Sequence, residues 1–162
     1  MSQVVLVTGA SSGIGAAVAR EYDRRGARVA LLARRVDRIE ALAHELRDAK
    51  AIVCDVCDDA SVERAFAEAL NAFGRLDVVI ANAGVGINGT VESLSIDDFR
   101  RQMETNVFGA VRTVKSAIAP LRMTRGKVAL VGSVSGYIAL PATAPYAMSK
   151  FALRALAEAL AG

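Results

Sequence analysis

The sequence predicts an α/β protein built on a doubly wound parallel sheet. Short apolar runs rich in β-branched residues alternate with longer segments of helical period along the 162 residues. Polar and apolar residues do not alternate within the runs, which is typical of strands buried on both faces. A glycine-rich turn follows the first run, where sheets of this kind bind ligands. We therefore expect one domain over residues 1–162.

Five strands and five helices are predicted from these segments. Each strand is bounded by Gly, Asp, Asn or Arg, and each helix repeats its apolar residues with the helical period. The predicted strands are residues 4–7, 28–33, 51–54, 76–81 and 127–132, and the predicted helices are residues 13–25, 36–48, 59–73, 96–120 and 146–160.

Capping residues support three of the predicted helix starts. Asp58 and Asp59 precede the third helix, and Ser95 precedes two acidic residues at the start of the fourth. Pro145 stands at the expected first position of the last helix, where a missing N–H costs little.

Composition excludes several classes of protein. Hydrophobic residues make up 53% of the chain and charged residues 23%, which is typical of a folded domain. The net charge of +3 is spread without a basic run, so we expect no nucleic-acid partner. No apolar stretch reaches the roughly 20 residues that span a bilayer. With no basic leader at the start and two cysteines in all, we expect a cytoplasmic protein without a membrane partner.

The glycine-rich turn has the features of a phosphate cradle. The first strand runs into TGASSGIG at residues 8–15, and a helix follows. Gly9 permits a tight turn, Gly13 lets the backbone approach a pyrophosphate, and Gly15 lets helix and strand pack closely. The alternative is a tight turn with no ligand. The residues expected to contact a dinucleotide here are Gly9, Ser11, Ser12, Gly13, Ile14 and Gly15.

The spacing Gly-x-x-x-Gly-x-Gly differs from the common dinucleotide fingerprint and resembles the cofactor loop of the short-chain dehydrogenase/reductase family. The resemblance extends over essentially the whole chain. It implies a Rossmann fold with strand order 3-2-1-4-5, a nicotinamide dinucleotide cofactor, and interconversion of an alcohol and a carbonyl.

The end of the second strand favours NADP(H), with NAD possible. An NAD site usually has an Asp or Glu about 20 residues after the loop, to bind the ribose hydroxyls. Here Ala33 is followed by Arg34 and Arg35, which could hold a 2′-phosphate. The alternative is that both arginines are solvated loop charges.

Two further motifs contact the cofactor by resemblance. Asp55 would bind the adenine ring with the Val56 backbone beside it, although an Asp here could instead cap the next helix. Asn82, Ala83 and Gly84 would stabilise the central sheet beside the cofactor; alone they could be a polar turn.

Cys54 and Cys57 form a Cys-x-x-Cys, which can be a redox motif. Redox pairs usually lie at a helix N-terminus, whereas Cys54 ends a buried strand, so we do not favour this interpretation. His44 is the only histidine and lies in a charged helix, so no metal site is expected.

Tyr146 and Lys150 are the strongest indication of catalysis. Residues four apart lie on one face of a helix. A free tyrosine is a poor base at neutral pH, and a nearby ammonium favours the phenolate. Lys150 could also bind the cofactor ribose, while Tyr146 passes a proton to or from the substrate oxygen as hydride moves.

Two other residues complete the catalytic set by resemblance. Ser133, thirteen residues before Tyr146, resembles the family's catalytic serine and would hold the substrate oxygen; Ser135 is its competitor. Asn106 resembles the helix asparagine, which holds a water that links Lys150 to solvent.

Family members continue for further strands, and those C-terminal strands have no counterpart in these 162 residues. Strand 127–132 would then be an open edge. The chain could be an excerpt of an enzyme, a half-fold that binds cofactor without turnover, or a subunit completed by another chain. A homo-oligomer through helices 96–120 and 146–160 is expected by resemblance.

The motif set therefore predicts an NADP(H)-dependent oxidoreductase acting on a small-molecule alcohol or carbonyl. The alternative is a non-catalytic dinucleotide-binding module or a fragment of a longer enzyme. Residues 85–90 and 136–143 are expected to border the pocket, and their small or apolar character suggests an uncharged substrate.

Overall fold

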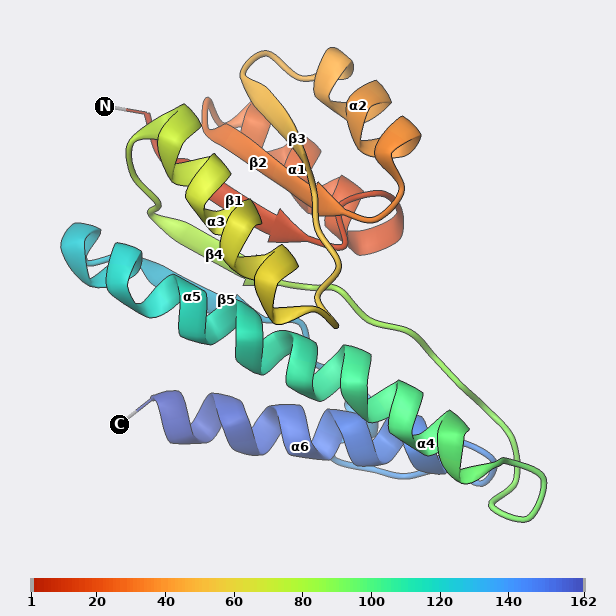
Figure 1. The fold of residues 1–162 in the computed structure, drawn as a ribbon. Helices are drawn as coiled ribbons and strands as arrows, with labels where there is room; N and C mark the ends of the chain where they lie inside the picture. Colours follow the sequence, from red (N-terminus) through yellow and green to blue (C-terminus); the bar gives the residue numbers. More distant parts are fainter. Residues whose placement is uncertain (1, 162) are drawn as a thin grey trace.

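The computed structural model describes residues 2–161 and has one five-stranded sheet within them. All neighbouring strands are parallel and the order is β3-β2-β1-β4-β5, which confirms the predicted fold and strand order (Figure 1). The strands are β1 (Val4–Thr8), β2 (Arg28–Ala33), β3 (Ala49–Val53), β4 (Val78–Ala81) and β5 (Lys127–Leu130).

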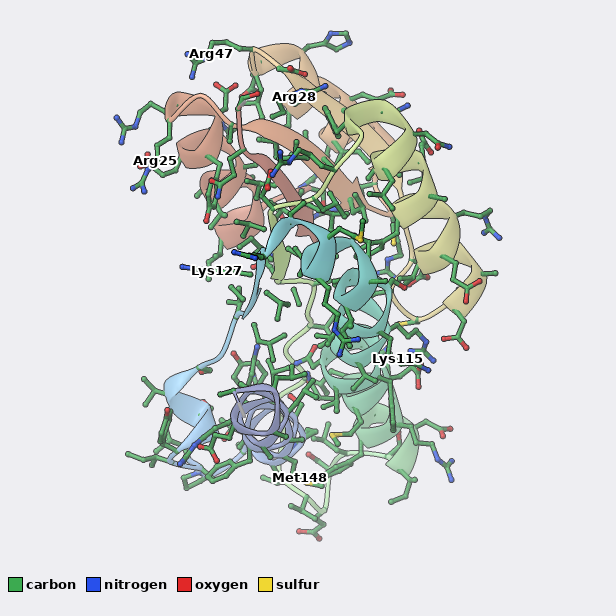
Figure 2. All side chains as sticks on the ribbon, turned by 90° about the vertical axis from the view of Figure 1, so that its left-hand side faces the viewer. Arg25, Arg28, Arg47, Lys115, Lys127 and Met148 are labelled. Carbon is green, nitrogen blue, oxygen red and sulfur yellow. The ribbon has the colours of Figure 1, made fainter. Side chains whose placement is uncertain are left out.

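Helices cover both faces of this sheet at β1, β2 and β4, whose residues are almost all buried. The edge strand β5 differs from the prediction, because its Lys127 and Ala129 are exposed. The helices are α1 (Gly13–Arg24), α2 (Val36–Glu45), α3 (Asp59–Phe73), α4 (Ile96–Met103), α5 (Gly109–Thr124) and α6 (Ala144–Leu160). One core cluster joins the sheet to α1 and α2, and another joins its opposite face to α3 and α5. Figure 2 looks along α6 and places it beside α4 and α5, away from α1 and α2.

The central strand shows how the sequence produces the two layers. All five residues of β1 are buried. Val4 and Leu6 pack toward α3 and α5, whereas Val5 and Val7 pack toward α1 and α2. An uninterrupted apolar run is therefore the correct pattern for a strand at the middle of three layers.

The predicted helix 96–120 is wrong in two respects. It contains a π-helical turn over Glu104–Phe108, so α4 and α5 form one long rod with an irregular centre (Figure 1). It also continues past Pro120 to Thr124. A proline removes one helical hydrogen bond but does not end this helix, because Leu121 in the next turn is buried in the core.

Other predicted boundaries move by one to three residues. β3 begins and ends earlier than predicted, and α2 ends at Glu45 because the following backbone is extended. α6 begins at Ala144, which puts Pro145 at its second position, where its missing N–H still costs nothing. The remaining changes are at β1, which extends to Thr8, α1, which ends at Arg24, β4, which begins at Val78, and β5, which ends at Leu130.

The predicted caps are present. The Asp58 carboxylate accepts a hydrogen bond from the Ala60 N–H (3.0 Å), and Asp59 is the first helical residue. Ser95 Oγ accepts from the Asp98 N–H (3.2 Å) and the Asp98 carboxylate accepts from the Ser95 N–H (3.1 Å), a complete capping box. None of the helices in residues 2–161 is both long and apolar enough to cross a bilayer.

Truncating a side chain of the central strand β1 should measure how much burial between the two helical layers stabilises the fold. Leu6→Ala removes a fully buried side chain and should lower the free energy of unfolding by about 2–5 kcal/mol. Urea denaturation followed by circular dichroism would measure it. The matched variant Leu160→Ala, at the half-exposed end of α6, should cost much less. Equal losses for the two variants would contradict the layered core.

Candidate active site

A cavity of about 740 Å³ lies at the carboxyl ends of the strands, which is where open α/β sheets bind ligands. It is lined by the loops that follow all five strands, by the π-helical turn and by the start of α6. The predicted site residues that line it are Gly9, Ser11, Ser12, Ile14, Arg34, Arg35, Asp55, Val56, Asn82, Ala83, Gly84, Asn106, Tyr146 and Lys150.

The ends of β1 and β4 are joined by side-chain hydrogen bonds. Thr8 Oγ1 accepts from the backbone N–H groups of Asn82 and Ala83, both at 3.1 Å. The Asn82 side-chain amide donates to the carbonyl oxygens of Thr8 (3.0 Å) and Gly9 (3.3 Å). Asn82 therefore holds the glycine loop against the end of β4.

The three loop glycines are required for different reasons. Gly9 has φ +67°, and a Cβ on it would lie 2.8 Å from the Ala83 Cα. A Cβ on Gly15 would lie 2.5 Å from the Gly9 carbonyl oxygen. Gly13 has φ +56°, a conformation that favours glycine, and no atom lies within 4 Å of its Cβ position. Neither Gly13 nor Gly15 is among the residues that line the cavity, so their contacts with a cofactor stay predictions.

Arg35 extends over the glycine loop from the end of β2. Its guanidinium donates to Ser11 Oγ (2.8 Å) and Ser12 Oγ (2.6 Å), both from Nη2. Ser12 is the N-cap of α1 but makes no capping bond, and the first turn of α1 has no acidic residue. The loop thus combines hydroxyls, helix N–H groups and a cation, which suits a phosphate group.

Arg34 lies on the other side of the same strand end. Its guanidinium is 3.9 Å from the Asp55 carboxylate, and both groups are partly exposed. Such an exposed pair contributes little stability, so Arg34 remains free to contact a ligand.

Hydrogen bonds and close packing against α5 hold the turn that carries Asp55 and Val56. Asp55 Oδ1 accepts from the Cys57 N–H (3.0 Å), and Asp58 rather than Asp55 caps α3. Arg112 donates to the Val56 carbonyl oxygen (3.4 Å). A Cβ on Gly109 would lie 2.8 Å from a Val56 methyl carbon, so α5 approaches this turn closely.

The two cysteines do not have the environment of a redox pair. Both are free, and Cys54 is buried. Burial raises the pKa of the Cys54 thiol to about 11, which keeps it protonated at neutral pH. Cys57 Sγ lies 3.5 Å from Thr105 Oγ1. Their role is therefore packing beneath the Asp55 turn.

Tyr146 and Lys150 lie on one face of α6 and both line the cavity. Lys150 Nζ is 5.7 Å from the centre of the Tyr146 ring and donates to the Val131 carbonyl oxygen (2.8 Å). Lys150 is only 8% exposed, and burial lowers the pKa of its ammonium.

Asn106 lies in the π-helical turn and is fully enclosed. Its Oδ1 accepts from the Val85 N–H (2.8 Å), and its Nδ2 donates to the Val85 carbonyl oxygen and to Ser149 Oγ, both at 3.0 Å. Ser149 Oγ donates to the Tyr146 carbonyl oxygen (2.7 Å). Asn106 therefore links the loop after β4 to the helix that carries Tyr146.

Ser133 is not among the residues that line the cavity, whereas Ser135 is. Ser133 begins the 3-10 turn Val134–Gly136, and its Oγ accepts from the Ser135 N–H (3.1 Å). Its role as the substrate-oxygen ligand remains a prediction.

The family model for short chain dehydrogenases matches residues 3–162. The chain belongs to the short-chain dehydrogenase family.

Relatives of this short-chain dehydrogenase include bovine dehydrogenase/reductase SDR family member 7B, 36% identical over 97% of the chain and 52% of the relative. Bovine 3-ketodihydrosphingosine reductase is 37% identical over 96% of the chain and 50% of the relative. The chain thus spans about half the length of the curated relatives it matches. Among solved structures, an alcohol dehydrogenase from the archaeon Thermococcus sibiricus complexed with 5-hydroxy-NADP superposes with a TM-score of 0.96. It is 38% identical, over 99% of this chain and 70% of that one.

Four residues of this short-chain dehydrogenase were missed in the sequence analysis. Thr8 could have been found from sequence, because a threonine that ends a buried strand must satisfy its hydroxyl. Ser149 lies between Tyr146 and Lys150, and no sequence pattern distinguishes it. Gln102 and Arg112 lie on helices where polar residues usually face solvent, so no signal distinguished them.

The buried Lys150 should make stability depend on pH. Since the folded chain binds this proton less tightly than the unfolded chain, burial costs stability while the ammonium is charged in both states. The cost should fade as pH rises from the lowered pKa toward the ordinary lysine value of about 10.4.

Urea denaturation of the wild type and Lys150→Met at several pH values would measure this dependence. The stability of the wild type relative to Lys150→Met should rise as the pH increases toward the ordinary lysine pKa of about 10.4. The matched variant Lys115→Met, at an exposed position on α5, should show no such trend. A flat difference between wild type and Lys150→Met would contradict the buried ammonium.

Proposed function

We propose that this short-chain dehydrogenase is an NADP(H)-dependent oxidoreductase that interconverts an alcohol and a carbonyl. One observation carries the proposal: Tyr146 and Lys150 share a single cavity with the glycine loop and with Arg34 and Arg35. The likeness to an alcohol dehydrogenase complexed with 5-hydroxy-NADP supports it.

The residues present fit a dinucleotide along the whole cavity. The half over β2 and β3 has Arg34, Arg35 and Asp55, which suit an adenosine with a 2′-phosphate. Ser11 and Ser12, which line the cavity, and the N-terminus of α1 suit the pyrophosphate. The half over β4 and β5 has Lys150, which suits ribose hydroxyls.

The cofactor, when bound, supplies or accepts the hydride. The chain's own residues handle the proton. Tyr146 exchanges it with the substrate oxygen, and the nearby Lys150 ammonium stabilises the phenolate that results. Ser133 positions the substrate oxygen, and Asn106 supports proton exchange with solvent near Lys150.

A second candidate function is dinucleotide binding without turnover. The position of Ser133 favours it, because its hydroxyl accepts from the Ser135 N–H and does not line the cavity. In that case the cofactor site would be complete and the substrate site would not.

We propose an uncharged substrate, a cytoplasmic location and a homo-oligomer. Val85, Gly86 and Thr143 line the same cavity as Tyr146 and carry no charge. Bovine 3-ketodihydrosphingosine reductase has a ketone in its name, which agrees with a carbonyl substrate. Ile96 at the start of α4 and Phe108 in the π-helical turn are exposed apolar residues that could pack against a second copy.

Arg35 should determine the preference for NADPH. Isothermal titration of the wild type should show tighter binding of NADPH than of NADH. Arg35→Ala removes a charged donor and should weaken NADPH binding by about tenfold or more, with little effect on NADH. Arg38→Ala, at an exposed position on α2, is the control. Equal affinity of the wild type for both cofactors would contradict the NADP assignment.

Tyr146→Phe tests the chemistry. With NADPH and a panel of uncharged ketones, the variant should lose about 10²–10⁴-fold in turnover and keep its NADPH affinity. Tyr137→Phe, on an exposed ring outside the cavity lining, should retain full turnover. If Tyr146→Phe keeps normal turnover, Tyr146 is not the acid/base. NADPH binding by a wild type without any turnover would support the second candidate function.

A further inference from the structure

Gln102 is a fully buried polar side chain that the proposed chemistry does not use. It lies on α4 with 0% exposure, one helical turn before Asn106. A buried side-chain amide has to satisfy both a donor and an acceptor. Gln102 satisfies both on one short segment of backbone.

That segment is the extended chain after β4. Gln102 Oε1 accepts from the Ile87 N–H and Nε2 donates to the Val85 carbonyl oxygen, both at 2.6 Å. Asn106 binds the N–H and carbonyl oxygen of Val85 in the same way. Two amides at i and i+4 thus pair with Val85 and Ile87 as a neighbouring strand would, although residues 82–90 belong to no strand.

The segment held in this way is a wall of the cavity, formed by Val85, Gly86 and Asn88. Its far end is tied to the loop before α6 by the bond from the Gly89 N–H to the Ala142 carbonyl oxygen (2.8 Å). This wall follows β4, so it borders the half of the cavity that contains Tyr146 and Lys150. It lies apart from the half over β2 and β3.

We propose that Gln102 is a positioning residue that fixes this wall against the reacting end of the cofactor and substrate. The assignment rests on the proposed dinucleotide site. A glutamine that merely stabilised the fold would affect both halves of the cavity alike. A positioning residue should affect only ligands that reach the wall.

Two ligands distinguish an effect on one half of the cavity from an effect on both. In the proposed dinucleotide site NADPH would span the whole cavity, whereas adenosine 2′,5′-bisphosphate would occupy only the half with Arg34 and Arg35. Gln102→Met keeps the side-chain length and removes both hydrogen bonds. We expect it to weaken NADPH binding by roughly tenfold, because the wall is no longer fixed, and to change adenosine 2′,5′-bisphosphate binding less than about twofold.

Thr124→Val is the matched control. It removes a hydroxyl whose hydrogen is shared between the Leu76 and Leu121 carbonyl oxygens, at the far end of α5. Its affinity for both ligands should match the wild type. If Gln102→Met weakens both ligands equally, or neither, the positioning role is overturned.

Amide hydrogen exchange tests, without any ligand, whether Gln102 holds the wall. In the wild type the Ile87 N–H should exchange slowly although it belongs to no helix or strand, and in Gln102→Met it should exchange at least about tenfold faster. Fast exchange at Ile87 in the wild type overturns the proposal even if the variant does not fold. If the wild type binds neither ligand, the proposed function is wrong, and the Ile87 exchange rate still decides whether Gln102 holds the wall.

Discussion

The bonds between the ends of β1 and β4 are the constraint on which the rest of the site depends. The segments that follow two neighbouring parallel strands must diverge to leave a crevice between them. Here the segment after β1 turns into α1, whereas the segment after β4 continues as the cavity wall at Val85. Thr8 Oγ1 holds the Asn82 and Ala83 N–H groups at this point of divergence. Asn82 in turn binds the Gly9 carbonyl oxygen. The crevice therefore opens at a position set by four hydrogen-bonded residues.

Divergence at β1 and β4 also separates two kinds of chemistry. On the β2 side the groups are exposed and cationic, as Arg35 over the loop serines shows. An exposed arginine can replace its bound water by an anion at little cost in free energy, and it favours ligands that carry a phosphate. On the β5 side the important cation, Lys150, is buried, and burial lowers its pKa. A charge in that environment acts strongly on its neighbours, which suits a group that tunes Tyr146.

Sequence could predict the parts of the site in which one residue type is required. A glycine at φ +67° beside another backbone, such as Gly9, has few substitutes, so the loop is recognisable before folding. Contacts made by tertiary structure are different. Gln102 has the sequence appearance of a solvated helix residue, and only the return of the chain over α4 buries it. The π-helical turn at Asn106 and the orientation of Ser133 depend on the same packing, which no local pattern reveals.

The choice of amides next to the reacting end has an electrostatic consequence. Among the buried side chains of residues 2–161, Lys150 alone is charged at neutral pH, and no ion pair within that range involves it. Gln102 and Asn106 hold the wall without adding charge. A carboxylate in either place could accept the same N–H groups, but it would oppose the Val85 carbonyl oxygen and would offset the lysine's charge. Neutral amides leave the field of the ammonium directed at the cavity.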